Sequence, residues 1–123
     1  MNAVLMIKPG PLRDGLNTLL FAMSDVQLVA HPDNNNAAID FCRKKPGALM
    51  ILDIRSNDPG LLDTIPEMKE RCPLGRVVAL IHTESDLPSA EVFGADFIMG
   101  VGTRAYEVKA GIEEMGRSSA ETS

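Results

Sequence analysis

Asp53 is the side chain of this sequence from which a functional interpretation starts. It follows an apolar run, residues 48–52, that lacks the alternation of a half-exposed strand and so predicts a strand buried on both faces of a parallel sheet. Ligands and reacting groups of such sheets lie outside the carboxyl ends of the strands, which is where this carboxylate falls. The alternative interpretation is structural, with Asp53 capping the strand or beginning a turn. The run itself leaves both interpretations open.

The sequence has two histidines, and one of them can approach Asp53. His82 follows the apolar segment 77–81, so its ring and the carboxylate are both expected at carboxyl ends of strands, whereas His31 lies in a predicted loop. A histidine and an aspartate without a positioned nucleophile do not make a catalytic triad, and Ser85 lies on a polar loop. We therefore expect no enzyme activity, and we assign His82 a hydrogen-bonding role at the rim of the site.

The cysteines and methionines do not predict a metal site. Cys42 and Cys72 lie 30 positions apart in segments of helical character, and neither has another Cys or a His at metal-ligand spacing. We expect two free thiols, buried or half-exposed. The seven methionines fall on apolar stripes and are expected to fill the core, with one or two on a contact surface.

Length and composition predict one compact domain. The chain has 123 residues, of which 45% are hydrophobic, which suits one core and leaves no room for a second domain. We place the domain at residues 1–116 and expect the polar tail, 117–123, to be a frayed end or the start of a linker. Because no apolar stretch approaches a membrane span and no signal peptide is recognisable, we expect a cytoplasmic protein without membrane contact.

The charge of the chain argues against direct binding of nucleic acid. The formal net charge is −5, and the sequence contains no run of Lys or Arg that could bind a phosphate backbone. Any contact with DNA would therefore require another domain.

The order of apolar segments predicts the fold class. Five of them have the length and composition of short strands, at 3–7, 26–30, 49–54, 77–81 and 97–99. Segments with helical spacing lie between and after them, for example the stripe formed by Leu12, Leu16, Leu19, Leu20 and Met23. Strand and helix alternating in this way predict a doubly wound α/β sandwich with a central five-stranded parallel sheet and helices on both faces.

Local signals give further detail for three helices. Pro66 lies inside the third helical segment, so that helix is expected either to begin near Thr64 or to kink. The segment 87–93 is about two turns long and should form a short helix. The polar turn before the second helix should supply its N-cap from Asn35 or Asn36.

Four short motifs together resemble the receiver domain of two-component response regulators. They are Pro11-Leu12-Arg13-Asp14-Gly15-Leu16, Leu52-Asp53-Ile54-Arg55, Arg76-Val77-Val78-Ala79-Leu80 and Gly94-Ala95-Asp96-Phe97. Their order and spacing carry the resemblance, which covers residues 3–116 and is strongest to CheY-like receivers of LuxR/NarL-type transcriptional regulators. It implies a flavodoxin/CheY-like (βα)5 sandwich, and it makes Asp53 the equivalent of the phosphoacceptor aspartate.

The other functional positions of that family hold different residue types here. These positions are an acidic pair that binds Mg²⁺ after the first strand, a hydroxyl residue ending the fourth strand and a lysine ending the fifth. The acidic pair falls on Lys8 and Pro9. The hydroxyl position falls on Ile81, with Thr83 two residues later, and the lysine position falls on Val101, or on Gly100 if the alignment contains a one-residue gap. The resemblance is therefore to a degenerate receiver, or pseudo-receiver.

The missing acidic pair has a chemical consequence. A divalent cation neutralises the charge that gathers between phosphate and carboxylate during phosphoryl transfer, and Asp53 alone is a poor Mg²⁺ ligand. We therefore expect no Mg²⁺ or other cofactor, and little or no phosphorylation at Asp53. Lys8 is expected near Asp53, where an ion pair would keep the carboxylate ionised and favour one fixed state.

The resemblance also implies how such a domain would act. In related receivers, the fourth helix, fifth strand and fifth helix serve for dimerisation or partner binding, which corresponds here to the stretch from Leu87 to Met115. We expect signalling through protein contact or self-association at this face. A LuxR-type DNA-binding output domain is expected after Ser123, with a free-standing adaptor as the alternative.

Two further functions remain open. One is a small-molecule sensor that uses the vacated cleft, which would be lined by Lys8, Pro9, Asp53, His82, Thr83, Gly100, Val101, Gly102 and Thr103. Its glycine-containing loop can present backbone donors to an anion, although a flexible connection capped by Thr103 explains the same residues. The other is a functional phosphoacceptor domain with a non-standard metal site.

Overall fold

The structure is a computed structural model that describes residues 2–54, 59–82, 94–102 and 107–114. Strands and helices alternate along these ranges. The strands are β1 (Asn2–Met6), β2 (Leu28–Ala30), β3 (Leu49–Ile54), β4 (Arg76–Ile81) and β5 (Phe97–Gly100). The helices are α1 (Pro11–Ala22), α2 (Asn35–Lys44) and α3 (Pro59–Arg71), and residues 107–114 are helical as well.

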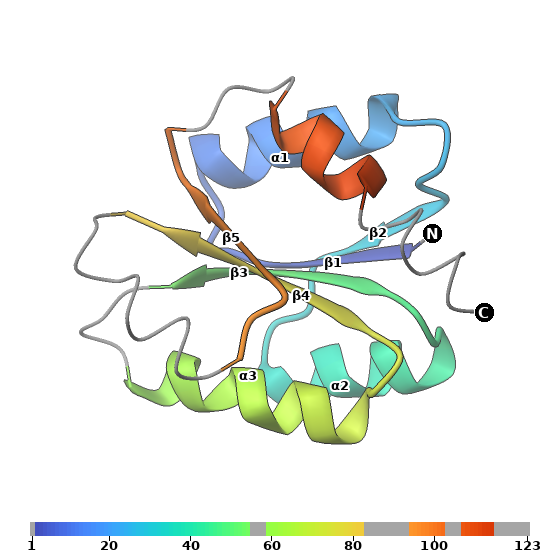
Figure 1. Cartoon of the computed structure of the whole chain (residues 1–123), viewed down its shortest axis with the longest axis vertical. Coiled ribbons are helices and arrows are strands. Elements are labelled where there is room, and N and C mark those ends of the chain that lie inside the picture. The colour runs from blue at the N-terminus through green and yellow to red at the C-terminus, as the bar shows by residue number, and fades with distance from the viewer. Residues whose placement is uncertain (1, 55–58, 83–93, 103–106, 115–123) are drawn as a thin grey trace.

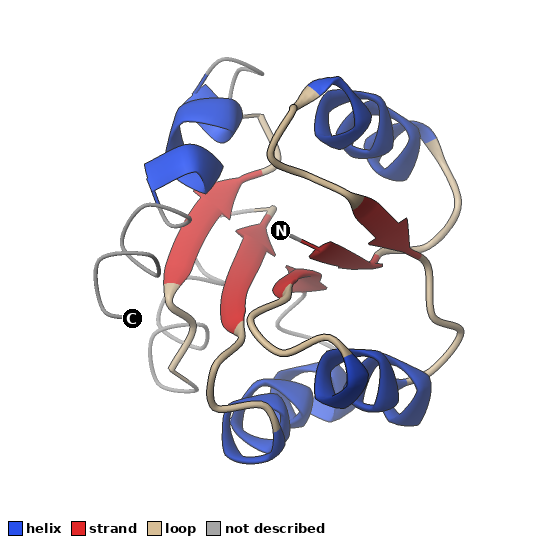
Figure 2. Ribbon diagram, turned by 90° about the vertical axis from the view of Figure 1, so that its right-hand side faces the viewer, coloured by secondary structure: helices blue, strands red, loops and turns tan. Residues whose placement is uncertain are grey.

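The five strands form one parallel sheet in the order β2-β1-β3-β4-β5. Helix α1 and the 107–114 helix cover one face of this sheet, and α2 and α3 cover the other (Figure 1). Figure 2 shows the same sandwich with the sheet between its two helical layers. The predicted doubly wound α/β fold is confirmed, with β3 at the centre of the sheet.

Strand β3 explains why the apolar run preceding Asp53 does not alternate. All six of its residues are buried. Met50, Leu52 and Ile54 belong to the core under α2 and α3, whereas Leu49 and Ile51 belong to the core under α1 and the 107–114 helix. Because successive side chains of a strand point to opposite faces, both faces of β3 require apolar residues.

The strand boundaries agree with the prediction to within two residues. The central strand, 49–54, is confirmed at both ends. Strand β2 begins at Leu28 rather than residue 26, because the backbone N–H of Val26 donates to the carbonyl of Met23 at 3.2 Å and so belongs to a turn. Strand β4 begins at Arg76, which lies opposite Leu49 in the parallel register.

The second helix begins one residue earlier than predicted. Its N-cap is Asn34, which has extended backbone angles and accepts a hydrogen bond from the N–H of Ala37 at 2.8 Å. The prediction of Asn35 or Asn36 as the cap is therefore wrong. Asn35 has another role, since its side-chain amide donates to the hydroxyl of Thr64 in α3 at 2.8 Å.

Helix α3 also starts earlier than expected. It begins at Pro59, where a proline suits the first turn, and continues through Pro66 to Arg71. The predicted start near Thr64 is wrong, and Thr64 is instead buried inside the helix. Pro66 is exposed, so water can solvate the carbonyl group that its missing N–H leaves without a helical partner.

Two predicted elements, the helix at 87–93 and the tail at 117–123, lie outside the described residues. No helix in the described part of the chain is both long enough and apolar enough to cross a membrane.

Candidate functional site

Asp53 lies near the carboxyl end of the central strand. It pairs in register with Leu80 of β4, and the next pair of residues ends both strands. Asp53 is one of two buried polar residues in the described core, with 9% of its surface exposed. The sheet thus presents a mostly buried carboxylate at the edge where parallel α/β folds place their chemistry.

His82 completes a pair with this carboxylate. It directly follows β4, and its Nε2 lies in hydrogen-bond contact with Oδ1 of Asp53. Because an ionised carboxylate only accepts hydrogen bonds, Nε2 must carry the proton when Asp53 is ionised. The His82 side chain is 30% exposed and that of Asp53 11%, so the imidazole covers the carboxylate from the solvent side. The predicted approach of His82 to Asp53 is confirmed.

Lys8 does not complete the site in the predicted way. Strand β1 ends at Met6, which lies opposite Leu52, so Lys8 lies beyond the end of the strand and is exposed. Among the described residues, no ion pair joins Lys8 to Asp53, and the predicted pair is therefore wrong. An exposed lysine at a chain turn gains little from such a contact and keeps its side-chain freedom.

The remaining predicted positions form the surroundings of the pair. Ile81 ends β4 half-buried against the core under α2 and α3, so this position offers no hydroxyl group. Gly100 lies opposite Ile81, and the N–H of Val101 donates to the Ile81 carbonyl at 2.9 Å. Pro9 and Gly102 are exposed, and Thr83 and Thr103 lie outside the described residues. The structure brings Asp53 and His82 into contact and places Gly100 and Val101 on the other side of β4 from Asp53.

A cavity of about 230 Å³ lies beside these positions but does not include Asp53 among its lining residues. It is formed between α1 and the ends of β4 and β5, and Gly100 and Val101 contribute to it. The rest of its lining is apolar, for example Leu16, Leu80 and Val108. This cavity suits an apolar group rather than the anion that the sequence suggested.

The described part of the chain offers few ligands for a metal ion. Within it, no three side chains of His, Cys, Asp or Glu lie close enough together to hold one. Mg²⁺ prefers several oxygen ligands, so the pair of Asp53 and His82 is a poor site for this ion. An Asp–His pair of this kind can hold a proton and fix the orientation of the imidazole.

The structure gives Asp96 a role that the sequence did not predict. Its Oδ2 accepts a hydrogen bond from the Val77 N–H at 2.8 Å, its Oδ1 pairs with Lys69 at 2.6 Å, and its own N–H donates to the Val77 carbonyl at 2.9 Å. Asp96 therefore fastens the start of β5 to both β4 and α3. The sequence analysis noted Asp96 only as part of the motif Gly94-Ala95-Asp96-Phe97, and this motif does not identify Lys69 or Val77 as its partners.

The second histidine is separate from this site. The Nε2 of His31 lies 3.0 Å from the Oδ1 of Asn17 on α1. Partial burial, and then the positive charge of Arg13, lower the pKa of His31. His31 thus supports the packing of the loop after β2 against α1.

Comparison with solved structures identifies the scaffold. A CheY-like protein (tadZ) from Pseudomonas aeruginosa PAO1 superposes with a TM-score of 0.80 at 16% identity, over 94% of this chain and 98% of that one. The isolated REC domain of RcsB from Salmonella enterica serovar Typhimurium gives 0.79 at 15% identity, over 96% and 89% of the two chains. The chain has the receiver fold.

A third solved structure with the same fold is a DNA-binding response regulator. A LuxR family DNA-binding response regulator from Silicibacter pomeroyi matches with a TM-score of 0.73 at 17% identity, over 94% of this chain and 90% of that one. No protein-family model matches the sequence, and no curated protein matches it either. At these identities the receiver fold is what the likeness establishes, and the chemistry must be argued from the residues at the strand ends.

Proposed function

We propose that this chain is a pseudo-receiver domain that signals through protein contact, with little or no Mg²⁺-dependent phosphorylation at Asp53. The observation that carries the proposal is the contact between His82 and the carboxylate of Asp53. The imidazole N–H occupies one oxygen of the group that would have to bind the metal ion and accept the phosphoryl group.

The residue types around the pair support the same conclusion. Phosphoryl transfer needs cationic groups or metal ions that neutralise the charge developing on the transferred group. The positions that supply the acidic pair, the hydroxyl and the lysine in receivers hold Lys8 and Pro9, Ile81, and Val101 here. The hydrogen bond with His82 gives the Asp53 carboxylate a partner without a metal ion, which suits a fixed state better than a phosphorylation cycle.

The output of such a domain would be a protein interface. We place it on the face that runs from Leu87 to Met115, as a surface for dimerisation or for a protein partner. The likeness to a LuxR family DNA-binding response regulator supports an attached DNA-binding output domain and a cytoplasmic, non-enzymatic role in transcription regulation. A free-standing adaptor without such an output domain is the alternative.

A small-molecule sensor is the second candidate, and the cavity between α1 and the ends of β4 and β5 favours it. The volume of about 230 Å³ and the apolar lining suit a small apolar ligand or the apolar part of a larger one. Thermal shift against nucleotides, cyclic dinucleotides and small apolar compounds tests this function. A melting temperature that stays constant across the whole panel would exclude it.

The experiment for the main proposal is an amide NMR titration with Mg²⁺ and then with beryllofluoride, which mimics a phosphoryl group on aspartate. We expect no saturable shifts at millimolar Mg²⁺ in residues 49–54 and 76–82. Saturable shifts that Asp53→Asn abolishes would overturn the proposal and establish a phosphoacceptor with a non-standard metal site. The matched control is Asp63→Asn, which removes an exposed carboxylate of α3: shifts that this variant abolishes as well would reflect non-specific cation binding.

A further inference from the structure

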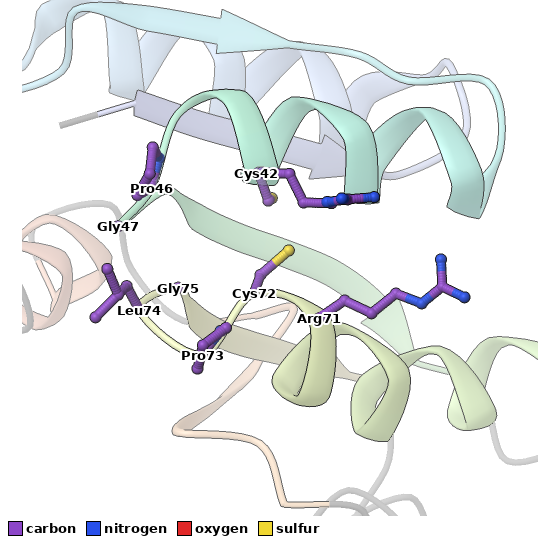
Figure 3. Close-up of a pocket in the computed structure, with 9 residues that line it drawn as sticks. Cys42, Pro46, Gly47, Arg71, Cys72, Pro73, Leu74 and Gly75 are labelled. Carbon is purple, nitrogen blue, oxygen red and sulfur yellow. The ribbon is translucent and has the colours of Figure 1, made fainter.

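The two cysteines of the chain meet at the end of the sheet opposite Asp53. Cys42 comes from the last part of α2, and Cys72 directly follows α3. Both lie just before a strand of the sheet begins, and their exposed surfaces are only 2% and 5%. Figure 3 shows the two side chains pointing toward one another across the gap between the helices, and the Cys72 thiol donates to the Ile39 carbonyl at 3.8 Å.

This pair lines a cavity that a small molecule can enter. The cavity has a volume of about 270 Å³, and both cysteines contribute to its wall together with Arg43, Arg71 and the exposed Leu74 (Figure 3). A water molecule takes up about 30 Å³ in the liquid, so the cavity has room for several molecules of that size. The thiols are buried with respect to the bulk surface, but a small polar oxidant can reach them.

The charges around the pair distinguish the two thiols. Burial raises the pKa of both, and that of Cys42 reaches about 12. The neighbouring Cys42 thiol and the guanidinium groups of Arg43 and Arg71 lower the pKa of Cys72 and so partly offset the effect of burial. Cys72 is therefore the thiol that ionises more readily, and since the thiolate is the nucleophile, it is the one that reacts first.

We propose that Cys42 and Cys72 form an oxidation site at which hydrogen peroxide creates a disulfide bond between the end of α2 and the end of α3. The Cys72 thiolate attacks one peroxide oxygen and becomes a sulfenic acid, while the O–O bond breaks and hydroxide leaves. The Cys42 sulfur then attacks the sulfenic sulfur, the S–O bond breaks, and water leaves. Two thiols and one peroxide thus give one disulfide and two waters.

The link would close a chain segment that contains the functional strand. The segment 42–72 includes the whole of β3 with Asp53, and a hydrogen bond already joins Asn35, at the start of α2, to Thr64, in the middle of α3. A disulfide across such a segment restricts the unfolded chain, so the oxidised protein should resist urea better than the reduced one. This site goes beyond the proposed function and does not depend on it.

The test treats the folded, reduced chain with hydrogen peroxide and then maps the peptides by mass spectrometry. We expect a loss of two hydrogen atoms in the intact mass and a cross-linked peptide that contains Cys42 and Cys72. Dithiothreitol should reverse both changes, and the urea midpoint should rise only in the oxidised form. In Cys42→Ser, dimedone should trap a sulfenic acid on Cys72, and in Cys72→Ser the trapping at Cys42 should be slower.

Several outcomes would overturn the proposal. One is that both thiols of the wild-type chain remain open to alkylation after peroxide treatment of the folded protein. Another is that the disulfide forms only between two copies or only in urea, and a third is that sulfinic acid appears without the link. Circular dichroism establishes that each serine variant is folded, and the wild-type peptide map decides the question even if a variant does not fold.

Discussion

Replacing His82 with alanine is the most direct perturbation of the candidate site. The change removes the imidazole that contacts Oδ1 of Asp53 and leaves a largely buried carboxylate without that donor. A hydrogen bond to a charged group contributes about 1.5–3 kcal/mol to stability. Because the His82 side chain is 30% exposed, water can partly replace it, and we expect the lower end of that range, about 1.5 kcal/mol.

A double-mutant cycle separates the pair from the other contacts of each residue. The cycle compares wild type, His82→Ala, Asp53→Asn and the double variant, and the coupling free energy should be about 1–1.5 kcal/mol. Since the chain has no tryptophan, unfolding in urea is followed by far-ultraviolet circular dichroism. The free energy of unfolding of a domain of this size falls by about 2 kcal/mol per molar urea, so His82→Ala should lower the urea midpoint of unfolding by about 0.7 M.

The other histidine provides the control. His31→Ala removes an exposed hydrogen bond to Asn17, and we expect it to cost less than about 1 kcal/mol and to show no coupling to Asp53→Asn. A coupling below about 0.5 kcal/mol between His82 and Asp53 would refute the reasoning, because the proposed function depends on this contact. Equal coupling of His31 and His82 to Asp53 would point to a general charge effect instead.

Two further predictions concern stability elsewhere in the molecule. Asp96→Ala removes the acceptor of the Val77 N–H and the partner of Lys69, so it should lower the free energy of unfolding in urea by about 2–3 kcal/mol. Lys69→Met removes only the ion pair and should cost about 1 kcal/mol or less. Equal losses in the two variants would contradict the larger role given to the hydrogen bond from Val77. Folding raises the pKa of Cys42 from 9.0 to about 12, mainly through burial, so between these pH values the unfolded chain releases a proton that the folded chain retains. The free energy of unfolding should therefore fall as pH rises through this window, and Cys42 accounts for at most about 1.4 kcal/mol per pH unit. In Cys42→Ala the free energy of unfolding should fall less steeply with pH.

The fold could be predicted from the sequence wherever burial imposed a pattern. The prediction of the central strand was correct at both ends because five of its six residues must be apolar to fill one of two cores. The local rules for helix starts and for proline predicted the structure less well. Three consecutive asparagines, 34–36, are equally good caps by type, and only the backbone angles select Asn34. Pro66 predicted a late helix start or a kink, whereas α3 begins at Pro59 and runs through Pro66, with Thr64 buried in the core.

The candidate site could be predicted only in part, for a related reason. Asp53 and His82 end neighbouring parallel strands, so the topology alone brings them together. Lys8 follows a strand end as well, but nothing in its spacing fixes where a long exposed side chain points. The contact between Cys42 and Cys72 joins residues 30 positions apart, and no periodicity in the sequence indicates that contact.

The core and the chemistry of this chain are separable. Five of the six residues of β3 fill the two cores, and these apolar positions specify the sandwich whatever group follows at the strand ends. Structures at 15–17% identity can therefore share the fold without sharing the reaction, because a reaction depends on a few side chains that contribute little to packing. Lys8 and Pro9 are exposed, so other residue types at these two positions would leave the core undisturbed. A receiver scaffold can for this reason keep its shape while the side chains at its strand ends change.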